Sequence, residues 1–370
     1  MATWKDLLGT LRTAFRVGKS SLDAGALTAL RTHTLPDLSG TLALTSQLGG
    51  GGAPAGNTKE VQYNNAGAFA GATNVGIDNG DLTFVYNATP PVAPPTDIVK
   101  LFAKKLGNTR IMAAAVGPSG MDYTLQPSMW RQKISRWNAP GNAATVPGVD
   151  GFGAMTVVGT ATARTVATTN LLTRIRRLGY VSAATAAAAC SVRSAAMFTA
   201  GTGAGLGGFF KSFRFAVSDA AAVAGARMFI GVDSAAPTNV EMNTRTNCFG
   251  IAQLSTDATQ LYLVYGGSAA QTAVALGTGF PIHNGTVGLT TGVPYDFMIW
   301  CPPSSNGVFN WQLDRLDTGT STGGTVTPGT PGTQTPANTT LLATSTYRVN
   351  NATALAVAID YSNIYAETDY

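Results

Sequence analysis

The stretch KSFRFAVS, residues 211–218, sets the fold class, because Phe213, Phe215 and Val217 alternate with polar or small residues. Side chains two residues apart lie on one face of a β-strand, so this stretch predicts a strand with one apolar face. The same alternation recurs in Leu261, Leu263 and Tyr265, in Phe309, Trp311 and Leu313, and in Leu355, Val357, Ile359 and Tyr361. Strands at this spacing, joined by Gly-rich turns, predict an antiparallel β-sandwich over residues 150–370, in a jelly-roll or lectin-like arrangement.

The composition of the chain also favours a mainly β structure. Charged residues make up only 12% of the 370 residues, and glycine contributes 43. Long solvated helices need more charge, whereas glycine suits the turns between many short strands. The 24 Lys and Arg exceed the 19 Asp and Glu only slightly, and the densest basic clusters are short, such as Arg174, Arg176 and Arg177. Nucleic-acid binding is therefore not expected, because it needs a basic face or stripe.

The sequence predicts no cofactor, metal or membrane anchor. Cys190, Cys248 and Cys301 stand far apart without a CxxC pair, so they predict buried thiols rather than disulfides or a zinc site. No apolar run approaches the length of a membrane-spanning helix. Lys5 and Asp6 interrupt the start of the chain, which is not typical of a secretion signal.

The N-terminal segment, residues 1–28, predicts an amphipathic helix. Five of its large apolar residues are spaced so that they share one helical face, namely Trp4, Leu7, Leu8, Leu11 and Phe15. A single helix of this length cannot bury such a face by itself. The face therefore docks on copies of the same chain, on the rest of the chain, or on a partner protein. The partner is favoured, because the helix precedes a linker.

Three further segments follow the helix. Residues 29–56 form an extended linker that ends in the flexible stretch GGGGAPAG. Residues 57–149 predict small β shaft modules, including a hairpin in which a Gly-Asn pair joins two apolar runs. Residues 150–370 form the head, in which the low-complexity stretch 317–340 predicts an exposed loop or an extended crossing between strands.

Several segments resemble recurrent pieces of bacteriophage tail fibres and tail-associated receptor-binding proteins. They are RTHTLPDLSGTLAL (31–44), VQYNNAGAFAGATN (61–74), LFAKKLGNTRIMAAAVGPSGMDYTLQP (101–127), GGFFKSFRFAVSDAAAVAGARMFIGV (207–232) and ATALAVAIDYSNIYAETDY (352–370). Together they touch most of the chain. The resemblance implies a homotrimeric virion fibre protein, assembled in the host cytoplasm, with an N-terminal anchor and a distal head.

The resemblance also implies the partners. The helical face of Trp4, Leu7, Leu8, Leu11 and Phe15 is then the virion attachment site, which docks on a tail, collar or portal-adaptor protein. The head is the part that contacts a receptor or glycan on the host surface. The residues themselves agree with a trimer, because the short strands of residues 30–150 carry few large apolar side chains and gain from a core shared among chains.

The sequence offers little for catalysis. His33 and His283 both lie in turn-like stretches, and the loose GxGxxG pattern at 201–208 precedes a strand instead of opening a helix. Most carboxylates of the head stand beside turns, where Asp is common for backbone reasons. The chain is therefore not expected to be an enzyme. A receptor-binding fibre is favoured over a purely structural head or collar fibre and over a polysaccharide depolymerase with paired carboxylates. No ligand-binding residue is named, because most aromatic residues alternate as core positions.

Overall fold

The computed structural model describes residues 59–66, 68–89, 91–106, 110–118, 122–125, 133–139 and 155–368. The predicted helix at 1–28, its attachment face and the linker at 29–56 lie outside the described residues and stay predictions, as does the trimer. Strands dominate the described residues, so the mainly β class is confirmed. Within these stretches the helical elements are short: α2 (Leu171–Arg174) and a 3₁₀ turn at Met242–Thr244.

Two small antiparallel sheets precede the head in sequence. The first holds β1 (Glu60–Asn65), β2 (Ala68–Asp78) and β3 (Asp81–Phe84), and the second holds β4 (Lys100–Leu106), β5 (Arg110–Val116) and β6 (Asp122–Thr124). Asp78 pairs with Asp81, so Asn79 and Gly80 form a two-residue turn, and both have the positive φ that a type I′ turn requires. β4 pairs with β5, which confirms the hairpin predicted around the Gly-Asn pair.

The head consists of two antiparallel sheets. One has eight strands, in the order β19-β18-β17-β12-β21-β10-β9 with β7 also paired to β21. Its strands are β7 (Lys133–Asn138), β9 (Thr160–Ala163), β10 (Leu178–Val181), β12 (Phe209–Val217), β17 (Tyr295–Cys301), β18 (Phe309–Arg315), β19 (Thr320–Val326) and β21 (Ala358–Thr368). The other has seven strands, in the order β16-β15-β14-β13-β20-β11-β8. Its strands are β8 (Thr156–Val158), β11 (Ala189–Arg193), β13 (Arg227–Asp233), β14 (Cys248–Gln253), β15 (Tyr262–Gly266), β16 (Val274–Ala275) and β20 (Ala343–Val349).

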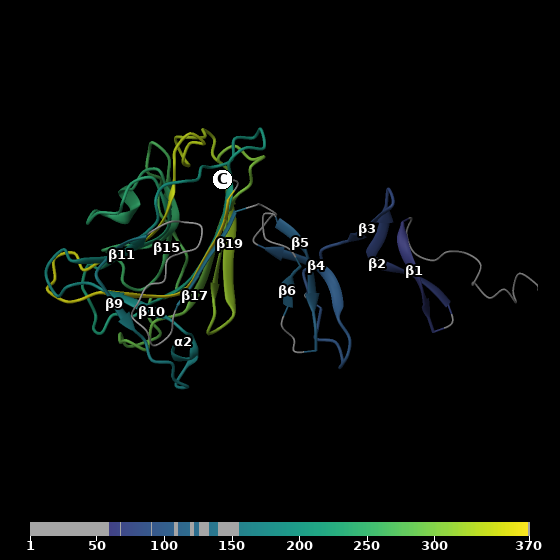
Figure 1. Ribbon diagram of the computed structural model, residues 1–370, viewed down its shortest axis with the longest axis horizontal. Helices are drawn as coiled ribbons and strands as arrows, with labels where there is room; N and C mark the ends of the chain where they lie inside the picture. Colours follow the sequence, from purple (N-terminus) through teal and green to yellow (C-terminus); the bar gives the residue numbers. More distant parts are fainter. Residues whose placement is uncertain are drawn as a thin grey trace, which may run out of the picture. The chain divides into compact units, whose positions relative to one another are not determined.

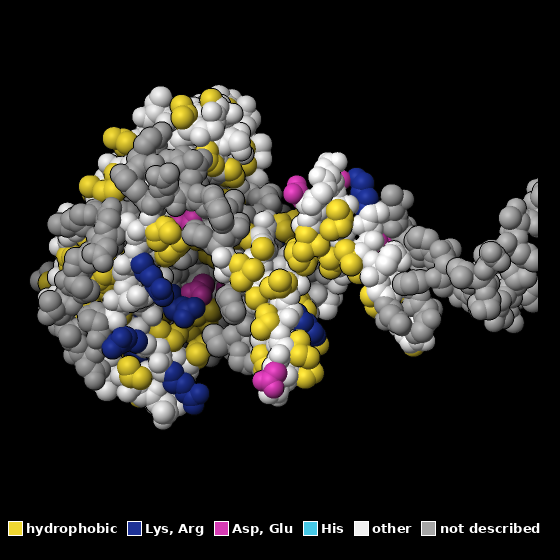
Figure 2. All heavy atoms as spheres, turned by 45° about the vertical axis from the view of Figure 1, so that its right-hand side comes forward, with side chains coloured by type: hydrophobic (Ala, Val, Ile, Leu, Met, Phe, Trp, Pro, Cys, Tyr) yellow, Lys and Arg dark blue, Asp and Glu magenta, His cyan; other side chains and the backbone are white. Residues whose placement is uncertain are grey.

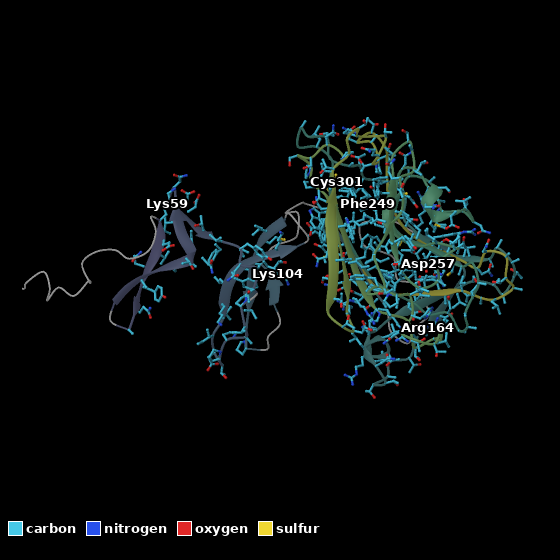
Figure 3. The ribbon with its side chains drawn as sticks, turned by 180° about the vertical axis from the view of Figure 1, so that it is seen from behind. Lys59, Lys104, Arg164, Phe249, Asp257 and Cys301 are labelled. Carbon is cyan, nitrogen blue, oxygen red and sulfur yellow. The ribbon has the colours of Figure 1, made fainter. Side chains whose placement is uncertain are left out.

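One hydrophobic core fills the space between the two sheets and confirms the sandwich. Figure 1 shows β17 and β19 in one layer and β11 and β15 in the other. Phe249 of β14 stacks on Phe309 of β18 with ring centroids 4.8 Å apart, so the two layers meet through aromatic side chains. Figure 3 shows Phe249 and Cys301 towards one end of the sandwich and Arg164 towards the other.

Burial follows the predicted alternation, with one correction. Phe213, Phe215 and Val217 are all buried in the core, as the alternation of β12 predicts. The prediction that Leu355 lies on the same apolar strand face as Ile359 is wrong, because β21 begins at Ala358 and Leu355 is 45% exposed. The reason is a turn: the side-chain amide of the buried Asn350 donates to the carbonyl oxygen of Leu355 at 2.7 Å and holds that residue outside the strand.

Two segments differ from their sequence-based description. β7 lies in the range 57–149 that the sequence assigns to the shaft modules, yet it pairs with β21 and contributes the buried Trp137 to the core of the sandwich. In the stretch 317–340, residues 320–326 form the edge strand β19 rather than a loop. Farther along this stretch Thr335 is buried, and its hydroxyl donates to the carbonyl oxygen of Gly307 at 2.8 Å. Threonine and glycine thus serve here as strand and packing residues.

Candidate functional site

The outer face of the eight-stranded sheet carries an open groove of about 460 Å³, called here the outer groove. It lies over β7, β21, β12 and β17. Its lining residues are Arg136, Asn138, Ser212, Arg214, Asp296, Met298, Ser362, Asn363 and Tyr365. On β12, Ser212 and Arg214 alternate with the buried Phe213 and Phe215, so the pleat that builds the core also points these polar side chains outward.

The strand register brings the groove residues together from distant parts of the chain. One cross-strand row holds Asn138, Asn363, Arg214 and Asp296, and the next holds Arg136, Tyr365, Ser212 and Met298. The side-chain amide of Asn363 donates to the side-chain oxygen of Asn138 at 2.7 Å. Directly opposed residues of antiparallel strands have neighbouring side chains, so each row forms one band across the sheet.

A β-bulge shapes the floor of the outer groove. The pairing of β12 with β21 shifts between Arg214 and Phe215, which leaves Ser362 as an extra residue on β21. The carbonyl oxygen of Ser362 accepts a hydrogen bond from the backbone N–H of Ala139 at 2.9 Å. A bulge bends its strand and redirects the neighbouring side chains, and such irregularities are common beside binding sites.

An ion pair lies in the middle of the groove. The guanidinium of Arg214 donates through Nε to Oδ1 of Asp296 at 2.7 Å and through Nη2 to Oδ2 at 2.6 Å. These hydrogen bonds raise the pKa of Arg214 above its usual range. The side chains of Arg214 and Asp296 are 42% and 27% exposed, so both remain accessible to a ligand. Two parallel hydrogen bonds fix the orientation of both planar groups.

An aromatic ring is part of the lining of the outer groove. Tyr365 packs edge-on against Phe210, whose ring in turn lies against that of Trp300. The Tyr365 hydroxyl donates to Oε1 of Glu367 at 2.8 Å. Burial, together with this hydrogen bond, raises the pKa of Tyr365 above its usual value. The ring is therefore held in place, with its edge and hydroxyl group oriented before any ligand arrives.

Two smaller hollows lie near the outer groove. Arg214 and Ser362 of the groove also line a narrow hollow of about 10 Å³, which shares Leu172 and Pro294 with a further hollow of about 120 Å³. The last hollow is lined mostly by polar residues, among them Asn170, Asn284, Thr290, Thr291 and Asp317. Shared lining residues thus place the three hollows next to one another.

A buried ionic cluster lies beside the narrow hollow. Asp360 is 1% exposed, and its two oxygens accept from Nε of Arg164 at 3.0 Å and from Nε of Arg177 at 2.7 Å. The hydroxyl of Ser218 donates to Oδ1 of Asp360 at 2.6 Å. Asp360 lies on β21, whereas Arg164 directly follows β9, Arg177 directly precedes β10 and Ser218 directly follows β12. The cluster therefore joins segments that are far apart in the sequence.

The structure changes the description of several carboxylates. The sequence analysis expected most carboxylates of the head beside turns, but Asp360, Asp219 and Asp233 are buried partners of arginines. A buried carboxylate needs such partners, since an isolated charge is costly away from water. The three cysteines are buried thiols, as predicted.

Most of the residues that the sequence analysis proposed for attachment or considered for catalysis are not described by the structure. Trp4, Leu7, Leu8, Leu11, Phe15 and His33 all lie outside the described residues. His283 is partly buried in a short bridge to Gly292, and burial lowers its pKa to about 4. The sequence analysis missed the groove residues, although one signal was present: Ser212 and Arg214 alternate with phenylalanines in residues 211–218.

No group of three or more His, Cys, Asp or Glu side chains in the described part of the chain is placed to hold a metal ion. None of the helices in that part has the length and apolar character needed to cross a bilayer.

Comparison with known proteins yields likenesses in structure only. No protein-family model and no curated protein matches the chain. Lectin II from Ulex europaeus has a TM-score of 0.39 and 14% identity, over 64% of this chain and 98% of the lectin. The carbohydrate recognition domain of Emp47p has a TM-score of 0.38 and 9% identity, over 64% of this chain and 95% of that domain. A protein of unknown function from Shewanella oneidensis MR-1 has a TM-score of 0.38 and 13% identity, over 66% and 90% of the two chains. These likenesses assign no ligand and no site residue to this chain.

Proposed function

We propose that this chain is a fibre subunit of a bacteriophage virion, and that its lectin-like head binds glycans of the host surface in the outer groove. The groove itself carries the proposal. It is open, it holds amide, hydroxyl, guanidinium and carboxylate groups, and the ring of Tyr365 is part of its lining. A saccharide presents hydroxyl groups around its edge and C–H groups on its faces, so it suits oriented polar groups beside an aromatic ring.

The carboxylates of this face favour binding over cleavage. Both oxygens of Asp296 accept hydrogen bonds from Arg214. Asp314, which lies opposite Asp296 on β18, accepts from Gln312 and from Ser321. A glycosidase needs one carboxyl group that holds a proton to donate, whereas a guanidinium partner stabilises the ionised form. This arrangement supports the proposal that the chain is not an enzyme.

The place in a virion rests on the resemblance of residues 31–44 and 61–74 to phage fibre segments. In this proposal the helical face of Trp4, Leu7, Leu8, Leu11 and Phe15 attaches the fibre to a tail, collar or portal-adaptor protein, and the head points outward. A single shallow saccharide site binds weakly. Three heads on one trimer raise the overall affinity through avidity.

The test fills the groove without touching the core. Ser212→Tyr places a large side chain in the outer groove, because Ser212 lies on the outer face of β12. Val158→Tyr is the matched control, since Val158 is 46% exposed on β8 of the other sheet. Host cells are incubated with each full-length protein, and adsorption of phage particles that carry the fibre is then measured. Wild-type protein and the control are expected to slow adsorption, and Ser212→Tyr is expected to lose this effect.

The opposite results are informative as well. If folded Ser212→Tyr competes as well as the wild type, the outer groove is not the receptor site. If no form of the protein binds cells or slows adsorption, the purely structural head or collar fibre is the better description. Release of reducing sugar from host polysaccharide by the wild-type protein would establish a depolymerase instead.

A further inference from the structure

The outer groove contains one positive charge that its other lining residues do not neutralise. Among its lining residues Arg214 and Asp296 neutralise each other through two hydrogen bonds. Arg136 is the remaining charged residue of the lining, and its side chain is exposed. It makes no ion pair with any residue that the structure describes. An exposed guanidinium within a groove is available to a ligand.

This feature is uncommon within the head. Most arginines of the described sandwich are held in ion pairs with Asp or Glu: Arg164, Arg177, Arg193, Arg214, Arg227, Arg245, Arg315 and Arg348. Arg174, Arg176 and Arg136 make no ion pair with a described residue, and of these only Arg136 lines the outer groove. Figure 2 shows Lys and Arg side chains gathered on one face of the sandwich, with acidic groups among them.

The surroundings of Arg136 leave room for a negative ligand group. Arg136 lies opposite Tyr365 in the strand register, near enough that its charge counteracts part of the rise in the Tyr365 pKa. The nearest acid farther along β21 is Glu367, which is 0% exposed and accepts a hydrogen bond from Tyr365. A ligand in the groove therefore meets the exposed guanidinium, and the buried carboxylate of Glu367 is out of its reach.

We propose that the outer groove selects saccharides that carry an anionic group, a carboxylate or a phosphate, and that Arg136 binds this group. This inference deepens the glycan-binding function proposed above and rests on it. The guanidinium fork presents paired N–H donors that match two oxygens of a carboxylate or a phosphate. Asn138, Asn363 and Tyr365 stand beside it and hydrogen-bond the hydroxyl groups of the same or the next sugar unit. Arg214 stays paired with Asp296 and orients neutral parts of the ligand.

The experiment compares matched probes on the full-length protein. An array carries neutral oligosaccharides together with uronate-, sialate- and phosphate-bearing ones. Each anionic probe that binds is then titrated in solution beside its neutral form, which is the methyl ester for a carboxylate and the dephosphorylated sugar for a phosphate. Loss of one charge-assisted hydrogen bond at an accessible site lowers the affinity about tenfold, and this is the difference expected between each anionic probe and its neutral form. The affinity for the anionic form is also expected to fall as salt is added.

Two variants separate a specific contact from general attraction. Arg136→Gln is expected to bind the anionic and the neutral probe equally. Arg176→Gln removes the same charge at an exposed residue that lines none of the three hollows, and it is expected to keep the preference. The inference is overturned if Arg136→Gln keeps the preference, or if Arg176→Gln loses it to the same extent. Equal binding of charged and neutral probes by the wild type overturns the inference but leaves glycan binding intact. Failure of every saccharide to bind overturns both.

Discussion

Replacement of Asp360 by Asn is expected to destabilise the head strongly, because it leaves two buried guanidinium groups without their counter-charge. Asp360 accepts from Arg164 and Arg177, whose side chains are only 10% and 5% exposed. An asparagine side chain has almost the same size but no charge. Asparagine has one side-chain oxygen, which can accept from only one of the two arginines. Its NH₂ group then faces the N–H donor of the other arginine, so that hydrogen bond is replaced by contact between two donors.

The expected magnitude follows from burial. Removal of one member of a buried ion pair costs about 3–5 kcal/mol, a large part of the roughly 5–15 kcal/mol that stabilises a domain. For a domain of this size each kcal/mol lowers Tm by about 2–4 °C, so a fall of about 6–20 °C is expected. Asp296→Asn makes the same chemical change in a partly exposed pair, where the expected loss is about 0–1 kcal/mol.

The assay is thermal unfolding followed by tryptophan fluorescence, since Trp300 and Trp311 are buried in the head and report on its unfolding. The two variants are compared by their Tm values. Both lose one carboxylate and gain one amide, so a difference in Tm reports the burial of the Asp360 ion pairs. If Asp360→Asn lowers Tm by no more than Asp296→Asn does, the Asp360 cluster is not the structural support described here.

Three further predictions concern the oligomeric state, the N-terminal attachment face and the cysteines of the head. Light scattering of the purified protein should give about three times 38.0 kDa, and a clean monomer at micromolar concentration would rule out the trimer. Leu8→Asp combined with Leu11→Asp should leave the head folded but prevent incorporation into particles, because charges then enter an apolar contact; normal incorporation would place the anchor elsewhere. Cys190, Cys248 and Cys301 should react with a thiol reagent only after denaturation, because burial raises the pKa of each thiol to about 12 and leaves almost no thiolate at pH 8. Rapid reaction of any of them in the native protein would contradict their burial.

The strands of the head and their buried faces could be predicted from the sequence. Phe213, Phe215 and Val217 are buried because successive side chains of a strand point to opposite faces, which is a property of the local backbone. The β4–β5 hairpin follows from the same kind of local information, a Gly-Asn pair between two apolar runs. The same alternation wrongly predicted that the strand includes Leu355. A hydrogen bond from the side chain of Asn350 holds Leu355 in a turn before the strand begins.

The outer groove could not be predicted from the sequence, because it forms only when distant strands pair. Its residues come from β7, β12, β17 and β21, and they become neighbours only through the register of these strands and the bulge at Ser362. The burial of Asp360 between Arg164 and Arg177 likewise depends on pairings that span most of the head. A strand's own sequence determines which side chains share its face, because that depends on local backbone geometry. Which strand lies beside it depends on the packing of the whole sandwich, so Arg136 and Arg214 could be placed in one groove only from the complete fold.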